Sequence, residues 1–107
     1  MKPLLDRDQQ LLTVNVPGDL VSTNAEILRR ALHEILDTEI PSPPWRRLRL
    51  ELAGAKMVDS MGLNLIVTIL RAVQKTGGRM QITFSSPNVH RTFQFTRLDQ
   101  HVELIKV

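Results

Sequence analysis

Apolar and polar residues alternate along this chain in two rhythms, one typical of strands and the other typical of helices. Apolar residues at every second position predict three strands, and residues that favour turns follow them. These strands are marked by Leu12, Val14 and Val16, by Leu48, Leu50 and Leu52, and by Met80, Ile82 and Phe84. Residues 102–107 predict a last apolar strand, and residues 3–5 could add a short strand at the start.

The first predicted helix starts at a capping box and ends before a proline-rich segment. Thr23 and Glu26, three residues apart, would each satisfy a backbone N–H group near the other residue. Ile27 and Leu28 begin a series of apolar residues at helical spacing, which predicts one buried face. Residues 40–44 contain three prolines and therefore predict an irregular connection.

Two further helices are predicted in the second half of the chain. Residues 60–76 are apolar at nearly every position up to the last turn, so this helix is either covered on more than one side or presents an apolar edge to a partner. Gly77 and Gly78 predict its end. Ser86 and Pro87 then predict the N-cap and the first residue of a shorter helix.

This order of strands and helices favours an α/β fold with a mixed, mostly parallel sheet. Polar residues alternate with Leu48, Leu50 and Leu52, which leaves one face of the sheet polar and places the helices mainly on the other face. The chain has 107 residues, of which 42% are hydrophobic, and it shows neither an internal repeat nor a long linker. We therefore expect one domain over residues 1–107.

Composition narrows the function classes further. The net charge of +3 would permit contact with nucleic acid, but the basic residues are scattered in pairs and only 4% of residues are aromatic, so we expect no direct nucleic-acid binding. No run approaches the roughly 18 apolar residues of a membrane span, and the first residues do not resemble a signal peptide. We expect a cytoplasmic protein without membrane insertion. The absence of cysteine excludes disulfides and thiolate zinc sites.

The motifs of common enzyme classes are missing from the chain. The five glycines do not fall at the spacing of a nucleotide-binding loop. His33, His90 and His101 lie in separate predicted elements, and no pair has the spacing of metal ligands. The residues around Ser60 do not form the Gly-x-Ser-x-Gly turn of hydrolases. We expect a protein that is not an enzyme and that needs no metal or other cofactor.

Ser60 stands where a predicted strand region meets the long apolar helix. As the predicted N-cap, its hydroxyl would accept a hydrogen bond from a free backbone N–H group in the first turn. The aligned peptide dipoles place about half a positive charge at this end of the helix, which would tolerate a phosphoryl group. Spacing alone leaves both a structural cap and a functional serine open.

The element order and several short motifs resemble the STAS domain family and, within it, the bacterial anti-sigma factor antagonists. The shared motifs are the turn Gly18-x-Leu20 leading to Asn24, the run Val58-Asp59-Ser60-Met61-Gly62-Leu63, the pair Gly77-Gly78, and Ser86-Pro87-Asn88-Val89. The resemblance implies that Ser60 is phosphorylated by a partner anti-sigma factor that is itself a serine kinase with a histidine-kinase-like ATPase fold. Phosphorylation would switch the protein off and regulate transcription through partner switching.

The resemblance also implies a partner-binding surface around the serine. Its residues would be Asp59, Met61, Gly62, Leu63, Asn64 and Asn24. Asp59, Ser60, Gly62 and Leu63 match the family pattern directly, whereas Met61 and Asn64 depart from it, as does Val21. The protein would act as a monomer or weak dimer.

A second interpretation belongs to another functional class. STAS-like domains also serve as constitutive, non-enzymatic subunits or scaffolds of transporters and lipid-trafficking complexes. In that role Ser60 would be only a helix cap. The start of its helix would then be a permanent interface that is insensitive to phosphate.

Overall fold

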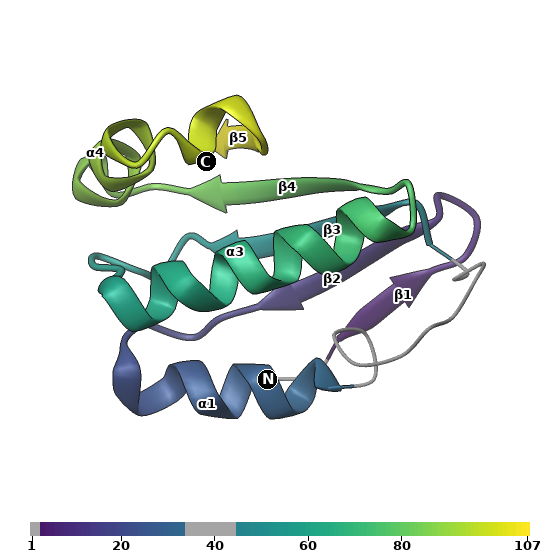
Figure 1. Cartoon of the computed structure of the whole chain (residues 1–107), viewed down its shortest axis with the longest axis horizontal. Coiled ribbons are helices and arrows are strands. Elements are labelled where there is room, and N and C mark those ends of the chain that lie inside the picture. Colours follow the sequence, from purple (N-terminus) through teal and green to yellow (C-terminus); the bar gives the residue numbers. More distant parts are fainter. Residues whose placement is uncertain (1–2, 34–44) are drawn as a thin grey trace.

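The chain forms a mixed five-stranded sheet whose strands follow one another in sequence order (Figure 1). The computed structural model describes residues 3–33 and 45–107. β1 (Leu4–Asp6) runs antiparallel to β2 (Leu11–Asn15), and the remaining neighbours pair in parallel, namely β3 (Arg47–Leu52), β4 (Arg79–Phe84) and β5 (Glu103–Lys106). The predicted α/β class, the mostly parallel sheet and the short first strand are therefore confirmed.

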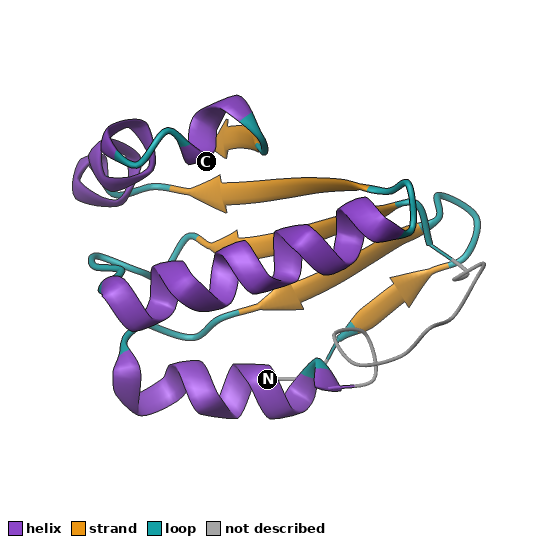
Figure 2. Ribbon diagram, in the orientation of Figure 1, coloured by secondary structure: helices purple, strands orange, loops and turns teal. Residues whose placement is uncertain are grey.

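The helices lie on one side of this sheet (Figure 2). α1 (Ser22–Ala31) and α3 (Ser60–Lys75) cover its face side by side, and α4 (Pro87–Phe95) and the 3₁₀ helix η1 (Leu98–Gln100) lie at the β4–β5 end (Figure 1). This arrangement confirms the prediction that helices pack mainly on one face. The proline-rich segment 40–44, which was predicted to be irregular, lies outside the described residues.

One hydrophobic core fills the space between the sheet and the helices. Every second residue of each central strand points into it, as period-two alternation requires. The strands contribute the buried side chains Val14, Leu48, Leu50, Leu52, Ile82 and Phe84, and the helices contribute Leu28, Ile66, Ile69, Val73 and Phe93.

The first helix begins differently from the prediction. Its N-cap is Val21, and Asn24 Oδ1 accepts a hydrogen bond from the Val21 N–H at 2.8 Å. Glu26 instead pairs with Arg29 at 2.8 Å on the exposed side of the helix. The capping box assigned to Thr23 and Glu26 is therefore wrong, because the helix starts earlier and Asn24 takes the position that was given to Glu26.

The apolar face of α1 is also rotated from the predicted one. Ile27 is 58% exposed, whereas Ala25 and Leu28 are buried, as is Leu32 just beyond the helix. Ala25, Leu28 and Leu32 lie three and four residues apart, so they form one stripe toward the core. The apolar residue Ile27 belongs to the solvent-facing side.

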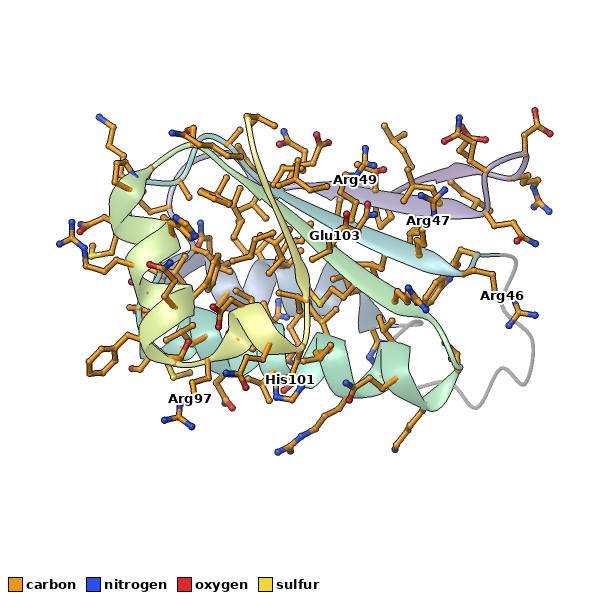
Figure 3. All side chains as sticks on the ribbon, turned by 90° about the horizontal axis from the view of Figure 1, so that it is seen from above. Arg46, Arg47, Arg49, Arg97, His101 and Glu103 are labelled. Carbon is orange, nitrogen blue, oxygen red and sulfur yellow. The ribbon has the colours of Figure 1, made fainter. Side chains whose placement is uncertain are left out.

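A row of hydrogen-bonded side chains crosses the polar outer face of the sheet. Arg49, Gln81 and Glu103 occupy matching positions on β3, β4 and β5. Arg49 Nε donates to Gln81 Oε1 at 3.1 Å, and Gln81 Nε2 donates to Glu103 Oε2 at 2.8 Å. Gln81 is buried between these neighbours, and Figure 3 shows Arg49 and Glu103 on the face opposite the helices. β4 lies between β3 and β5, so Gln81 is buried. Its hydrogen bonds with Arg49 and Glu103 supply the partners that its amide would otherwise lack.

The sequence of α3 is unusually apolar because the helix is covered on more than one side. It packs against both α1 and β4, and its buried residues include Leu65, Ile66, Ile69 and Val73. This confirms the first of the two alternatives predicted for the helix. Within residues 3–33 and 45–107, no helix combines the length and the apolar character that crossing a bilayer requires.

Ile66 and Ile69 test the placement of α3 in the core. Both are fully buried, so Ile66→Asp or Ile69→Asp should lower the free energy of unfolding by about 3 kcal/mol or more, because each introduces an unpaired buried charge. Chemical denaturation measures the change. Thr68→Asp, at an exposed position of the same helix, is the control and should stay within about 1 kcal/mol of the parent. Equal stability of the core variants and the control would contradict this packing.

Candidate functional site

Two loops that follow β2 and β3 are joined at one edge of the sheet. The Leu20 N–H donates to the Met57 carbonyl at 3.1 Å, and the Asp59 N–H donates to the Leu20 carbonyl at 3.2 Å. Asp19 Oδ1 adds to this link by accepting from the N–H groups of Lys56 and Met57 at 2.7 and 3.2 Å. Because parallel strands end at the same edge, the starts of α1 and α3 are brought together there.

Asp59 ties the starts of these two helices to each other. It is the N-cap of α3, and its Oδ1 accepts from the Gly62 N–H at 2.9 Å. Its Oδ2 accepts from the N–H of Ser22, the first residue of α1, at 3.0 Å. One carboxylate therefore satisfies a free N–H group of each helix and lies at the positive end of both.

These hydrogen bonds favour the ionised form of Asp59. The Gly62 N–H is the main reason that the pKa of the Asp59 carboxyl lies below its usual value, against an opposing effect of partial burial. The N–H groups of Ser22 and Met61 lower this pKa further. Asp59 is therefore a charged structural residue.

Ser60 is not the cap that its spacing predicted. It is the first residue of α3, one position after the capping Asp59, and it is exposed. Within the described part of the chain, its hydroxyl makes no hydrogen bond. The prediction assigned the cap to the wrong member of the Asp-Ser pair, since both residue types are good N-caps and sequence alone does not separate them.

Gly62 faces the interior of the protein. It is buried, and a Cβ at this position would overlap the carbonyl oxygen of Leu20 and lie 3.0 Å from Leu20 Cγ. The helix can thus lie against the loop before α1 only because residue 62 has no side chain. Its assignment to the partner-binding surface stays a prediction, and the structure shows a packing role for Gly62 in the contact with Leu20.

The other predicted partner-binding residues fall into two groups. Met61 is 54% exposed and Asn64 is exposed, while Leu63 is half-buried and packs against the core. Asn24 is also half-buried, because its amide nitrogen donates to the Asp19 carbonyl and its oxygen caps α1. Ser60, Met61 and Asn64 therefore form the accessible part of the site, and Asn24 organises the loop beneath it.

Sequence analysis missed Asp19 and Ser22 as parts of this arrangement. Asp19 follows Gly18 in a turn, where aspartate often bonds to nearby backbone, but its partners are about 37 residues away in sequence. Ser22 contributes only its backbone N–H. No pattern within the chain indicates that a backbone group will meet a distant carboxylate.

The histidines and acids do not suggest a metal centre. Over residues 3–33 and 45–107, no three of the side chains that bind metals are grouped as ligands would be. His90 stacks on Phe84 with ring centroids 4.7 Å apart, which gives it a packing role.

Sequence comparison relates the chain to one protein family. A family model described as STAS domain matches residues 2–107. A Thermotoga neapolitana protein named as an anti-sigma factor antagonist and TM1081 homolog is 30% identical over 60 residues, which is 56% of this chain and 53% of that protein. A Thermotoga maritima protein of the same description is 28% identical over the same lengths, so the match spans about half of each of these relatives.

Solved structures share the fold at low sequence identity. The Thermotoga maritima protein TM1081 superposes with a TM-score of 0.80 at 21% identity, covering 98% of this chain and 85% of that one. The anti-sigma factor antagonist SpoIIAA in its unphosphorylated form gives 0.72 at 16% identity, covering 99% and 87%. The phosphorylated form of SpoIIAA, from Bacillus, gives 0.68 at 17%, covering 92% and 84%.

Gly62 provides a test of the contact between α3 and the loop before α1. Gly62→Ala should lower the free energy of unfolding by about 1–3 kcal/mol, because the added methyl group must displace the Leu20 backbone. Asn64→Ala, at an exposed position in the next turn, is the control and should be nearly neutral. Thermal and chemical denaturation measure both. A Gly62→Ala protein of parental stability would show that the helix and loop are not in tight contact.

The pH dependence of stability tests whether the ionised Asp59 carboxylate stabilises the fold. Its folded pKa is lower than its unfolded pKa, so the ionised carboxylate stabilises the fold above the ordinary value of 3.8, and this contribution disappears as the pH falls through the folded pKa. Asp59→Asn should therefore be less stable than the parent at pH 7, and the difference should shrink below pH 3.8. Urea denaturation across this pH range measures it. A constant deficit in Asp59→Asn across this pH range would exclude a role for the charge.

Proposed function

The chain belongs to the STAS domain family, and we propose that within this family it acts as an anti-sigma factor antagonist switched by phosphorylation of Ser60. In this proposal the unmodified protein binds an anti-sigma factor that is a serine kinase with a histidine-kinase-like ATPase fold. Phosphorylation of Ser60 ends that binding. The exchange of partners then regulates transcription, and the protein itself catalyses no reaction.

The observation that carries the proposal is the division of roles between Asp59 and Ser60. Asp59 makes the capping hydrogen bonds to Gly62 and Ser22, whereas Ser60 is exposed at the start of α3. A hydroxyl that the fold does not use can be modified without loss of structure. The names of the Thermotoga relatives and the phosphorylated form of SpoIIAA support this interpretation.

The charges at the site explain why a phosphate on Ser60 would weaken binding of a partner. A phosphate on Ser60 would add a charge of roughly −1.5 to −2 beside the ionised Asp59. The positive ends of α1 and α3 offset part of this charge, so the fold should persist. A partner that covers Met61 and Asn64 would have to desolvate the phosphate, which weakens the complex.

Phosphorylation of Ser60 is testable with a purified kinase. Incubation with ATP, Mg²⁺ and a candidate anti-sigma serine kinase from the same organism should add one phosphate, and mass spectrometry should place it on Ser60. Ser22 is the matched control, because it is also an exposed serine at the first position of a helix next to Asp59. Modification of Ser22, or of neither serine by any such kinase, would contradict the proposal.

Two substitutions separate a switch from a permanent interface. Ser60→Ala should resist modification, bind the kinase, and stay within about 0.5 kcal/mol of the parent, because Asp59 supplies the cap. Ser60→Asp should stay folded but bind at least about tenfold more weakly, a loss of 1.4 kcal/mol in binding free energy. Ser22→Asp adds the same charge nearby and controls for a general electrostatic effect. Equal affinity of the parent and Ser60→Asp would favour the scaffold interpretation, in which the domain is a constitutive subunit of a transporter or lipid-trafficking complex.

A further inference from the structure

The sulfur atoms of this chain belong to methionine alone, because the sequence has four methionines and no cysteine. Met57, Met61 and Met80 fall within the described residues. Met80 is in the core and is 2% exposed, whereas Met57 and Met61 are 52% and 54% exposed. A dissolved oxidant can therefore reach the thioethers of Met57 and Met61 directly, while that of Met80 is protected.

Met61 lies in the first turn of α3, directly after Ser60. Ser60 and Asn64 line a groove of about 470 Å³ between α3 and η1. Met61 and Asn64 are three residues apart, so their side chains are neighbours on one face of the helix. Met57 is about as exposed as Met61 but belongs to the loop before the helix, where its N–H group donates to Asp19 Oδ1 at 3.2 Å. A chemical change at Met61 therefore falls on the surface that holds Ser60.

The Met61 side chain can change without loss of the helix start. The hydrogen bonds that hold this end together run from the backbone N–H groups of Gly62 and Ser22 to the Asp59 carboxylate. An oxygen added to the Met61 sulfur leaves these bonds in place, and it lies near the positive end of the helix dipole. Oxidation of Met61 should therefore preserve the fold, whereas oxidation of the buried Met80 would place a polar group in the core.

A peroxide is the oxidant that this chemistry requires. The sulfur lone pair attacks one peroxide oxygen, so an S–O bond forms and the O–O bond breaks. The hydroxyl proton on the new S–O group passes to the departing hydroxide, which leaves as water. The thioether loses two electrons and the peroxide gains them. A methionine sulfoxide reductase reverses the step with a dithiol, which becomes a disulfide while the oxygen leaves as water.

Sulfoxidation replaces an exposed apolar group by a polar one. The new oxygen is a hydrogen-bond acceptor that a partner covering Met61 would have to desolvate. A phosphate on Ser60 weakens a complex for the same physical reason. Met61 is also a position at which this chain departs from the pattern of its family, so the effect would be a property of this protein.

We propose that Met61 is a site of reversible sulfoxidation by peroxides, and that its sulfoxide weakens partner binding at the Ser60 surface without unfolding the protein. The modification itself does not depend on the proposed function. Its effect on a partner rests on the proposed function, because that partner is the kinase that binds around Ser60. Peroxide would then act on the same surface as phosphorylation without using the serine.

The site is tested first without a partner. Hydrogen peroxide is added to the full chain, and mass spectrometry of its peptides follows the gain of one oxygen at each methionine. Met57 and Met61 should oxidise at least about tenfold faster than Met80, and sulfoxide reductases specific for the two sulfoxide epimers, with dithiothreitol, should restore both. Met57→Leu protein oxidised at Met61 should keep the unfolding midpoint of its reduced form and show shifted Ser60 and Gly62 amides in NMR spectra.

Matched variants then isolate the effect of Met61 on the kinase, after the peroxide has been removed with catalase. In Met57→Leu protein, oxidation should slow the phosphorylation of Ser60 at least about threefold, and reductase treatment should restore the rate. Met61→Leu protein acquires its sulfoxide at Met57 and should keep its rate. Met61→Gln introduces a polar side chain of similar size and should be slow without peroxide, whereas Met57→Gln should not.

Several outcomes would overturn the proposal. In the partner-free arm, these are a Met61 that oxidises as slowly as Met80, a sulfoxide that the reductases do not remove, and loss of the fold on oxidation at Met61. In the kinase arm, they are an unchanged rate after oxidation of Met61 and an equal loss in the Met61→Leu control. A kinase that fails to modify even the reduced parent would instead count against the proposed function, and the partner-free arm would still decide whether Met61 is a modification site.

Discussion

The Asp59 carboxylate is the interaction on which this end of the molecule depends. The chain must start two helices at one edge of a parallel sheet, and each helix start leaves backbone N–H groups without partners. Asp59 accepts from Gly62 in α3 and from Ser22 in α1, so a single charge satisfies both helices and holds them together. The loop before α1 follows α3 closely because Gly62 leaves room for the Leu20 carbonyl. The charged capping carboxylate of Asp59 and the glycine at position 62 therefore form one structural unit.

With the proposed function, this unit assigns structure to Asp59 and regulation to the adjacent Ser60. The aspartate carries the structural role, so the neighbouring serine can be exposed, and its hydroxyl can change chemically while the helices stay capped. The same proximity makes a phosphate there effective, because any new charge lies beside an existing one and at the edge of an apolar surface. A serine that was itself the cap would couple modification to unfolding. The arrangement avoids that coupling.

The surface around Ser60 extends in one direction, along α3. The side of this helix that faces the sheet is filled by residues such as Ile66 and Ile69, and the opposite stripe, with Asn64 and Val67, opens onto the groove beside η1. Ser60 lies at one end of this groove, so modification and binding would share one surface.

Much of the fold follows from the sequence, because it depends on local periodicity. Alternation around Leu48, Leu50 and Leu52 determines a strand with one buried face, and the continuous apolar run after Ser60 determines a helix covered on more than one side. Sequence motifs also located the Asp-Ser-x-Gly segment as the place of interest. Tertiary structure alone decided what each residue there does. Asp59, the cap of α3, also accepts from the N–H of Ser22, which is 37 residues away, and Gly62 lies against the Leu20 carbonyl. The groove likewise exists only because η1 returns beside α3. Such contacts join segments with no periodic relation in the chain, so only the packed structure defines them.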